Sequence, residues 1–261
     1  MQLVDAHCHL DFDVFDEDRN EVLQRARAVG IVHIVIPGTT RARWHHITAL
    51  CEQHDGLSAC YGLHPYFVTQ HDTPHLDALR KHAGGHDCVA IGECGLDFRP
   101  SQAPRDVQQQ YFEAQLDIAR ELDKPVVIHA VKATGQVIQT LQRFAGLRGM
   151  IHSYSGSYEQ AMELIDMGFL LSFGAAAINP RATRLRDTIR RLPLSALLLE
   201  TDAPDQPGPL HRGQRNQPAW LLDTLSGLAA LRGEHSADIA ARTTANAVQL
   251  FDLTLPASGS D

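Results

Sequence analysis

Short runs rich in Val, Ile and Leu recur along the chain, separated by longer stretches with helical periodicity. This alternation is typical of βα units arranged around a parallel sheet. It predicts eight strands that alternate with helices. The runs lie at residues 3–7, 31–36, 57–62, 88–93, 125–129, 149–153, 169–173 and 196–200.

The stretches between these runs carry apolar residues on one side and charged residues on the other. Residues 22–29 and 107–122 both show this spacing, which is that of helices covering a sheet. Ser157 is followed three residues later by Gln160, a capping-box pattern that marks a helix start. Two further helices are expected near residues 217–231 and 236–250.

Eight βα units in about 250 residues match the size of a TIM barrel. We find no linker or composition shift that would split the chain. The sequence therefore predicts a single α/β domain, a (β/α)8 barrel over residues 1–255, followed by a disordered tail at 256–261. An open doubly wound sheet is the alternative, but the Gly-rich first turn that usually accompanies it, G-x-G-x-x-G, does not occur.

Composition narrows the function classes. The net charge of −8 argues against a broad basic surface for duplex nucleic acid. A bound divalent cation can invert the local field, so a nucleic-acid substrate is not excluded. No apolar run approaches the roughly 18 residues of a membrane span, and no secretory signal pattern opens the chain. We expect a cytoplasmic protein, with a monomer favoured, and reduced thiols at its five scattered cysteines.

Ligand-type side chains occupy the ends of most predicted strands. His7 and His9 are two apart, so in an extended strand both imidazoles point to one side. In a barrel all strand ends surround one mouth. A single polar residue after a strand is more often a helix cap or turn former, and this is the alternative for Asp202 before Ala203 and Pro204. The set is His7, His9, Glu93, His129, His152 and Asp202, and His64 follows the third run outside these six.

Burying four imidazoles and two carboxylates around one mouth without a metal would cost several kcal/mol. Six ligands exceed the three of a catalytic zinc site and suit two cations, with Glu93 as the best candidate for a bridging carboxylate. The nitrogen and oxygen donors suit Zn, Mn, Co or Ni better than an all-oxygen Mg site, without selecting one. We expect two divalent cations per chain, with Zn, Mn and Mg as candidates.

These motifs resemble the TatD family of metal-dependent hydrolases, within the amidohydrolase-like barrels and nearest to their YjjV-like branch. The similarity extends through essentially the whole chain. The matching segments are 5–9, 62–65, 90–97, 125–129, 152–157, 200–204 and 215–218.

The resemblance implies the metal ligands His7, His9, Glu93, His129, His152 and Asp202, the same six that the strand ends indicate. It also implies phosphodiester hydrolysis that trims DNA, single-stranded or at 3′ ends. One departure is visible: family members commonly carry an arginine soon after the fifth-strand histidine, where this chain has Ala130, Val131 and Lys132. Lys132 supplies charge without the bidentate fork of arginine.

Asp202 is the predicted general base, because a carboxylate touching a metal can also accept a proton from water. Glu93 and His64 are the other catalytic candidates. His64 is also a candidate phosphate contact, with a packed turn histidine as its alternative. Arg215 and Asn216 are candidate substrate contacts with loop hydrogen bonding as the alternative, and Lys132 completes the substrate-binding set. Asp5 and Asp97 are expected to orient ligands.

Two other functions remain open. The first is an amidohydrolase or deacylase acting on a small amide or ester or on aminoacyl-tRNA. These enzymes share the fold and the metal chemistry, and the pocket determines which substrate is bound. Aromatic residues such as Tyr66, Phe67 and Trp220 in the pocket would favour nucleotides. The second is a non-catalytic scaffold, against which the complete ligand set argues.

Overall fold

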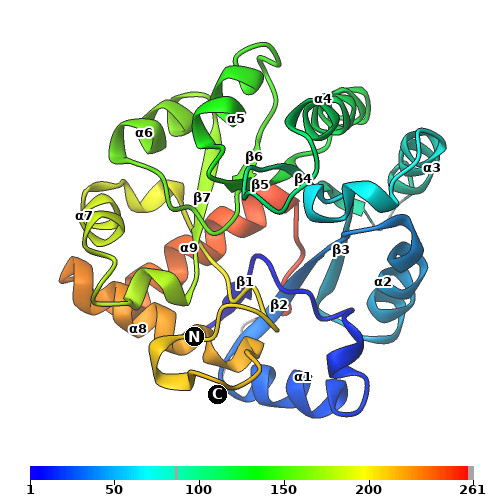
Figure 1. Cartoon of the computed structure of the whole chain (residues 1–261). Coiled ribbons are helices and arrows are strands. Elements are labelled where there is room, and N and C mark those ends of the chain that lie inside the picture. The colour runs from blue at the N-terminus through cyan, green and yellow to red at the C-terminus, as the bar shows by residue number, and fades with distance from the viewer. Residues whose placement is uncertain (86–87, 258–261) are drawn as a thin grey trace. The chain divides into compact units, whose positions relative to one another are not determined.

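The computed structural model describes residues 1–85 and 88–257. Its chain divides into two compact units, one formed by Met1–Ile36 with Ser172–Asp261 and the other by Pro37–Leu171. Strands and helices alternate along the chain (Figure 1). The expectation of a single domain over residues 1–255 stays a prediction. Of the predicted tail, residues 258–261 lie outside the described part of the chain.

The first unit contains the strands β1 (Leu3–Asp5), β2 (Ile31–Pro37, its last residue in the second unit) and β8 (Leu197–Leu199). β1 and β2 are parallel, and the end of β1 is joined to β8 because the Ala6 N–H donates to the Leu199 carbonyl at 2.9 Å. The longer helices are α1 (Arg19–Ala28), α7 (Thr183–Arg191), α8 (Leu221–Arg232) and α9 (Ser236–Phe251). Short 3-10 turns are η1 (Asp13–Phe15), η3 (Ala175–Ile178), η4 (Leu194–Ala196), η5 (Pro209–His211) and η6 (Pro218–Trp220).

In the second unit each strand pairs in parallel with the next one along the chain. These strands are β3 (Leu57–Tyr61), β4 (Cys88–Asp97), β5 (Val126–Val131), β6 (Gly149–Ile151) and β7 (Phe169–Phe173, its last two residues in the first unit). The helical elements are α2 (Arg41–Gln53), η2 (Pro65–Gln70), α3 (Pro74–Ala83), α4 (Arg105–Glu121), α5 (Thr134–Leu141) and α6 (Tyr158–Asp166).

The order of strands across the sheet is β1 to β8, the order of the strands in the sequence. Their apolar runs are continuous because parallel strands are buried on both faces. In β5, for example, residues 126–128 are fully buried, and Phe112 and Leu116 of α4 are equally buried. Among the described residues, no helix combines the length and the apolar character needed to span a membrane.

Most predicted elements are confirmed. Every predicted run contains a strand, α9 covers the expected helix after Ser236, and the capping box at Ser157 and Gln160 forms with both hydrogen bonds at 3.2 Å. The predicted end of β4 at Glu93 was wrong, because the strand continues to Asp97. Its last residues pair with β5, and the register shifts between Ile91 and Cys94. Glu93 therefore lies within a bulged strand.

Candidate functional site

Three ligand-type side chains converge in the first unit. His7 and His9 follow β1 and Asp202 follows β8. The two Nε2 atoms are 3.3 Å apart, and each lies 3.5 Å from Oδ1 of Asp202. All three side chains are buried, and their ligand atoms form a group that can hold a metal ion. We call these three residues the His7 cluster.

Backbone hydrogen bonds between the two segments set this geometry. The Asp202 N–H donates to the His7 carbonyl at 2.9 Å, and the His9 N–H donates to the Ala203 carbonyl at 2.8 Å. Asp202 has a φ of +56°, a conformation uncommon for residues other than glycine. The three candidate ligands are thus placed by the joined ends of β1 and β8.

Asp5 adds hydrogen bonds to the same junction. Its carboxyl group accepts hydrogen bonds from the backbone N–H and the hydroxyl of Thr201, at 2.9 and 2.5 Å, and from the N–H of His7 at 3.3 Å. Complete burial raises the pKa of Asp5 to about 8, although the hydrogen bonds from Thr201 oppose the shift. Asp5 therefore holds the backbone that carries these candidate ligands.

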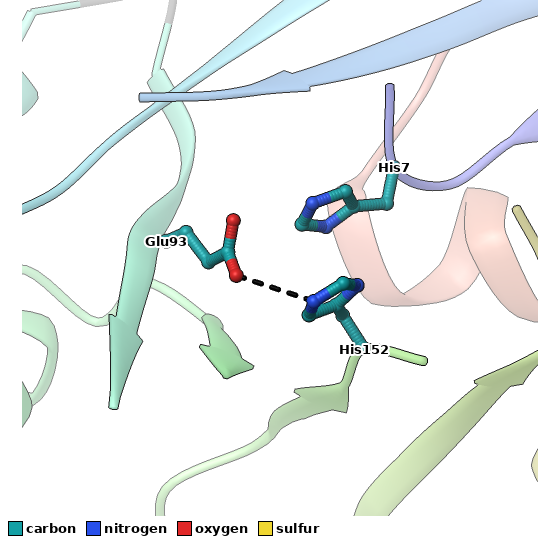
Figure 2. Close-up of side chains that lie close together, drawn as sticks. All are labelled: His7, Glu93 and His152. Atoms are coloured by element: carbon teal, nitrogen blue, oxygen red, sulfur yellow. Dashed lines mark ion pairs between the residues drawn. The ribbon is translucent and has the colours of Figure 1, made fainter. Parts of the chain in front are cut away.

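A second group of ligand-type side chains forms in the second unit around Glu93. Oε1 of Glu93 lies 2.9 Å from His64 Nε2, 2.8 Å from His129 Nδ1 and 3.2 Å from His152 Nε2. Figure 2 shows the ion pair between Glu93 and His152. The carboxylate is almost completely buried. We call these four residues the Glu93 cluster.

The bulge in β4 explains how Glu93 reaches three histidines. Gly92 precedes Glu93 and Gly95 follows two residues after it, and these glycines have φ values of +148° and +132°. A β-carbon on Gly92 would overlap the Val127 carbonyl oxygen, and one on Gly95 would overlap that of His129. Only glycine fits at both positions, so the backbone at this bend requires Gly92 and Gly95.

Asp97 and Arg99 continue the network beyond His129. Oδ2 of Asp97 lies 3.3 Å from His129 Nε2, and Nε of Arg99 donates to both Asp97 oxygens at 3.0 Å. Burial opposes ionisation of Asp97, but the hydrogen bonds from His129 and Arg99 hold its pKa well below the usual range. The pKa of His129 is raised, because the hydrogen bonds to Asp97 and Glu93 outweigh burial. A negative Asp97 thus orients His129.

His64 has a different electrostatic environment. Burial lowers its pKa to about 4, so the imidazole is neutral at pH 7. Its Nδ1 accepts the backbone N–H of Tyr66 at 2.9 Å, which places the ring proton on Nε2, facing Glu93. In this tautomer His64 is a donor that orients Glu93.

The predicted substrate contacts do not all lie in these clusters. Lys132 is exposed and directly follows β5. Arg215 donates to both oxygens of Asp18, at 2.9 and 2.6 Å, and lies over the ring of Phe15. The Asn216 side chain donates to the carbonyls of Thr201 and Asp205. These bonds are the loop contacts considered as the alternative, and the substrate roles stay predictions.

Two other features refine the sequence interpretation. Trp220 stacks on His211 with ring centroids 3.7 Å apart. All five cysteines are free, and burial raises the pKa of Cys8 and Cys94, so neither is an activated nucleophile.

Sequence reasoning did not single out Arg99, although its position two residues after Asp97 was a signal for the pair.

Known proteins resemble this chain over nearly its full length. A family model described as TatD related DNase matches residues 4–252. The uncharacterized metal-dependent hydrolase YjjV of Escherichia coli K12 is 34% identical, covering 97% of this chain and 98% of its own length. The 3'-5' ssDNA/RNA exonuclease TatD of Cronobacter sakazakii is 33% identical, covering 95% and 97%. The crystal structure of E. coli YjjV matches with a TM-score of 0.93 at 34% identity, over 97% of this chain and 98% of that one.

The structural match confirms the predicted fold class, a TIM barrel of parallel strands with helices between them. The chain belongs to the TatD family, as its motifs indicated.

Proposed function

We propose that the protein is a metal-dependent nuclease that hydrolyses phosphodiester bonds of DNA and trims single strands from the 3′ end. The observation that carries the proposal is the arrangement of three imidazoles within 3.2 Å of one buried carboxylate oxygen of Glu93. Membership of the TatD family and the name of the Cronobacter relative support a nucleic-acid substrate.

We propose two divalent cations per chain, one held by each cluster. In the His7 cluster two imidazole nitrogens and a carboxylate oxygen face one another at 3.3–3.5 Å, a donor set that fits Zn or Mn. His64 is left out because its Nδ1 accepts from the Tyr66 N–H, which keeps the ring proton on Nε2, whereas His129 can keep its proton on Nε2 toward Asp97 and offer Nδ1 to a metal. The proposed ligands are His7, His9, Glu93, His129, His152 and Asp202. Bridging by Glu93 stays a prediction.

The residues of the chain then have separate roles in proton transfer and in positioning. A bound divalent cation lowers the pKa of water at the site from about 15.7 to about 7. The Asp202 carboxylate takes the proton of the attacking water, while Gln206 Nε2 donates to Oδ2 at 2.5 Å and keeps the carboxylate oriented. His64 acts as a positioning residue by holding Glu93 through Nε2, and Asp97 does the same for His129.

The test uses purified protein stripped of metal and reloaded with Mg, Mn or Zn, with single-stranded DNA labelled at the 5′ end. We expect metal-dependent release of 3′ nucleotides and two metal ions per chain by elemental analysis. Asp202→Asn removes the proton acceptor and should lower kcat at least about 100-fold. Asp205→Asn is the matched control, since this exposed loop carboxylate lies outside both clusters, and its rate should match wild type.

Electron paramagnetic resonance of the Mn-loaded protein tests whether Glu93 bridges. Exchange-coupled manganese is expected if both ions share this carboxylate, whereas two uncoupled signals would contradict the bridge. Intact DNA in the presence of two bound metals would contradict the nuclease proposal. Small amides, esters and aminoacyl-tRNA would then be the substrates to assay.

A further inference from the structure

Tyr66 presents an aromatic ring to solvent beside the Glu93 cluster. Tyr66 belongs to η2 and is among the exposed large hydrophobic residues of the described chain, with 51% of its surface accessible. The backbone N–H of Tyr66 donates to Nδ1 of His64, and the ring packs edge-on against Phe67 with centroids 5.0 Å apart. The exposed ring is therefore held in place two residues from His64.

Arg99 places a cation next to this ring. Its Cζ lies 5.6 Å from the centre of the Tyr66 ring, within the range of a cation–π contact. Nε and Nη2 are fixed by the fully buried Asp97, which also raises the pKa of the guanidinium, so Arg99 is charged and oriented. Nη1 makes no hydrogen bond to any residue that the structure describes, and 43% of the side chain is exposed.

We propose that Tyr66 and Arg99 bind one nucleotide of a single-stranded substrate, with its base stacked on Tyr66 and a phosphate oxygen accepting from Nη1 of Arg99. The inference rests on the proposed nuclease function and adds how the strand is held. Proteins that bind single strands pair aromatic rings, on which bases stack, with cations that contact phosphates. Arginine in a fixed orientation suits phosphate because its planar donors match the oxygens.

The first experiment separates base recognition from phosphodiester chemistry. Oligothymidylate is compared with the same oligomer carrying a tetrahydrofuran abasic residue on either side of the scissile bond. At one of these positions, wild type should show a kcat/KM about 5- to 150-fold higher with the base present. Tyr66→Ala should bring this ratio close to one, whereas Tyr66→Phe keeps the ring and should retain the ratio.

An equal rate on base-bearing and abasic strands by wild type would overturn stacking on Tyr66 while leaving the nuclease function in place. A ratio that Tyr66→Ala leaves unchanged would also overturn it. Absence of any DNA hydrolysis would instead overturn the proposed function, so the two failures are distinguishable.

The second experiment tests Arg99 at saturating metal. Arg99→Gln should raise KM for the oligomer about tenfold or more, because it removes a charged phosphate contact. kcat should change less, and Arg99→Lys should fall between wild type and Arg99→Gln. Metal content is measured on each variant, because Arg99 also contacts Asp97. A KM for Arg99→Gln equal to that of wild type would overturn the phosphate contact.

Discussion

Asp97 contacts both the buried His129 of the Glu93 cluster and the partly exposed Arg99. One of its oxygens faces Nε2 of His129, and both accept from Nε of Arg99. A buried carboxylate of this kind fixes the orientation of an imidazole and makes it a stronger ligand. The same charge holds Arg99 in place, so a change at Asp97 should be felt by both partners.

Asp97→Asn keeps the shape of the side chain and removes its charge. We expect the metal affinity of the Glu93 cluster to fall about 10- to 100-fold, since His129 loses its negatively charged partner. Competition with a chromophoric chelator measures both constants. Asp77→Asn, at an exposed residue of α3 paired with Arg80, is the matched control and should change neither constant. A folded Asp97→Asn protein with wild-type affinities would show that Asp97 does not support the metal ligands.

At the residue level, the sequence indicated the candidate ligands because histidines and carboxylates stand next to apolar runs. Their grouping into His7 with Asp202, and Glu93 with His129, follows from hydrogen bonding between strand ends that are distant in sequence. The tautomer of His64 was not predictable, because it depends on the backbone N–H of Tyr66. Side-chain directions in loops require the three-dimensional structure.

At the level of elements, β4 shows why a strand end is hard to predict. Glu93 interrupts an apolar run, so the hydrophobic pattern ends there, but Gly95, Leu96 and Asp97 still pair with β5. A polar residue in the sequence marks the end of the apolar run, which is not the end of backbone pairing. Backbone pairing continues because β5 offers hydrogen-bonding partners up to Val131.

The two glycines of β4 should be intolerant of even one added carbon. We expect Gly95→Ala to destabilise the protein by at least about 2 kcal/mol more than a glycine replaced in open space, because its β-carbon overlaps the His129 carbonyl. Gly146→Ala is the matched control: its φ is also positive, +90°, but nothing lies within 4 Å of the added carbon. This control should cost about 1 kcal/mol. Urea unfolding of both variants measures the difference, and equal losses would show that β4 and β5 separate without penalty.

At the level of the whole molecule, charge limits how a nucleic acid can be held. The chain has 23 Lys and Arg residues against 31 Asp and Glu residues, giving a net charge of −8. The net charge therefore disfavours an extended nucleic-acid strand overall. For the proposed nucleic-acid substrate, attraction must then come from local features, namely the proposed divalent cations and oriented arginines such as Arg99.

Local recognition of this kind predicts a weak dependence of activity on salt. Each phosphate contact to a single strand contributes about −0.7 to the slope of log affinity against log salt. With one or two contacts, we expect log kcat/KM to fall with a slope no steeper than about −1.5 between 50 and about 300 mM NaCl at constant metal. A dinucleotide with one phosphate is the control, and its slope should be close to that of a 20-residue strand. A slope steeper than about −3 for the long strand alone would mean that four or more phosphates are bound, and that an extended cationic track exists in spite of the net negative charge.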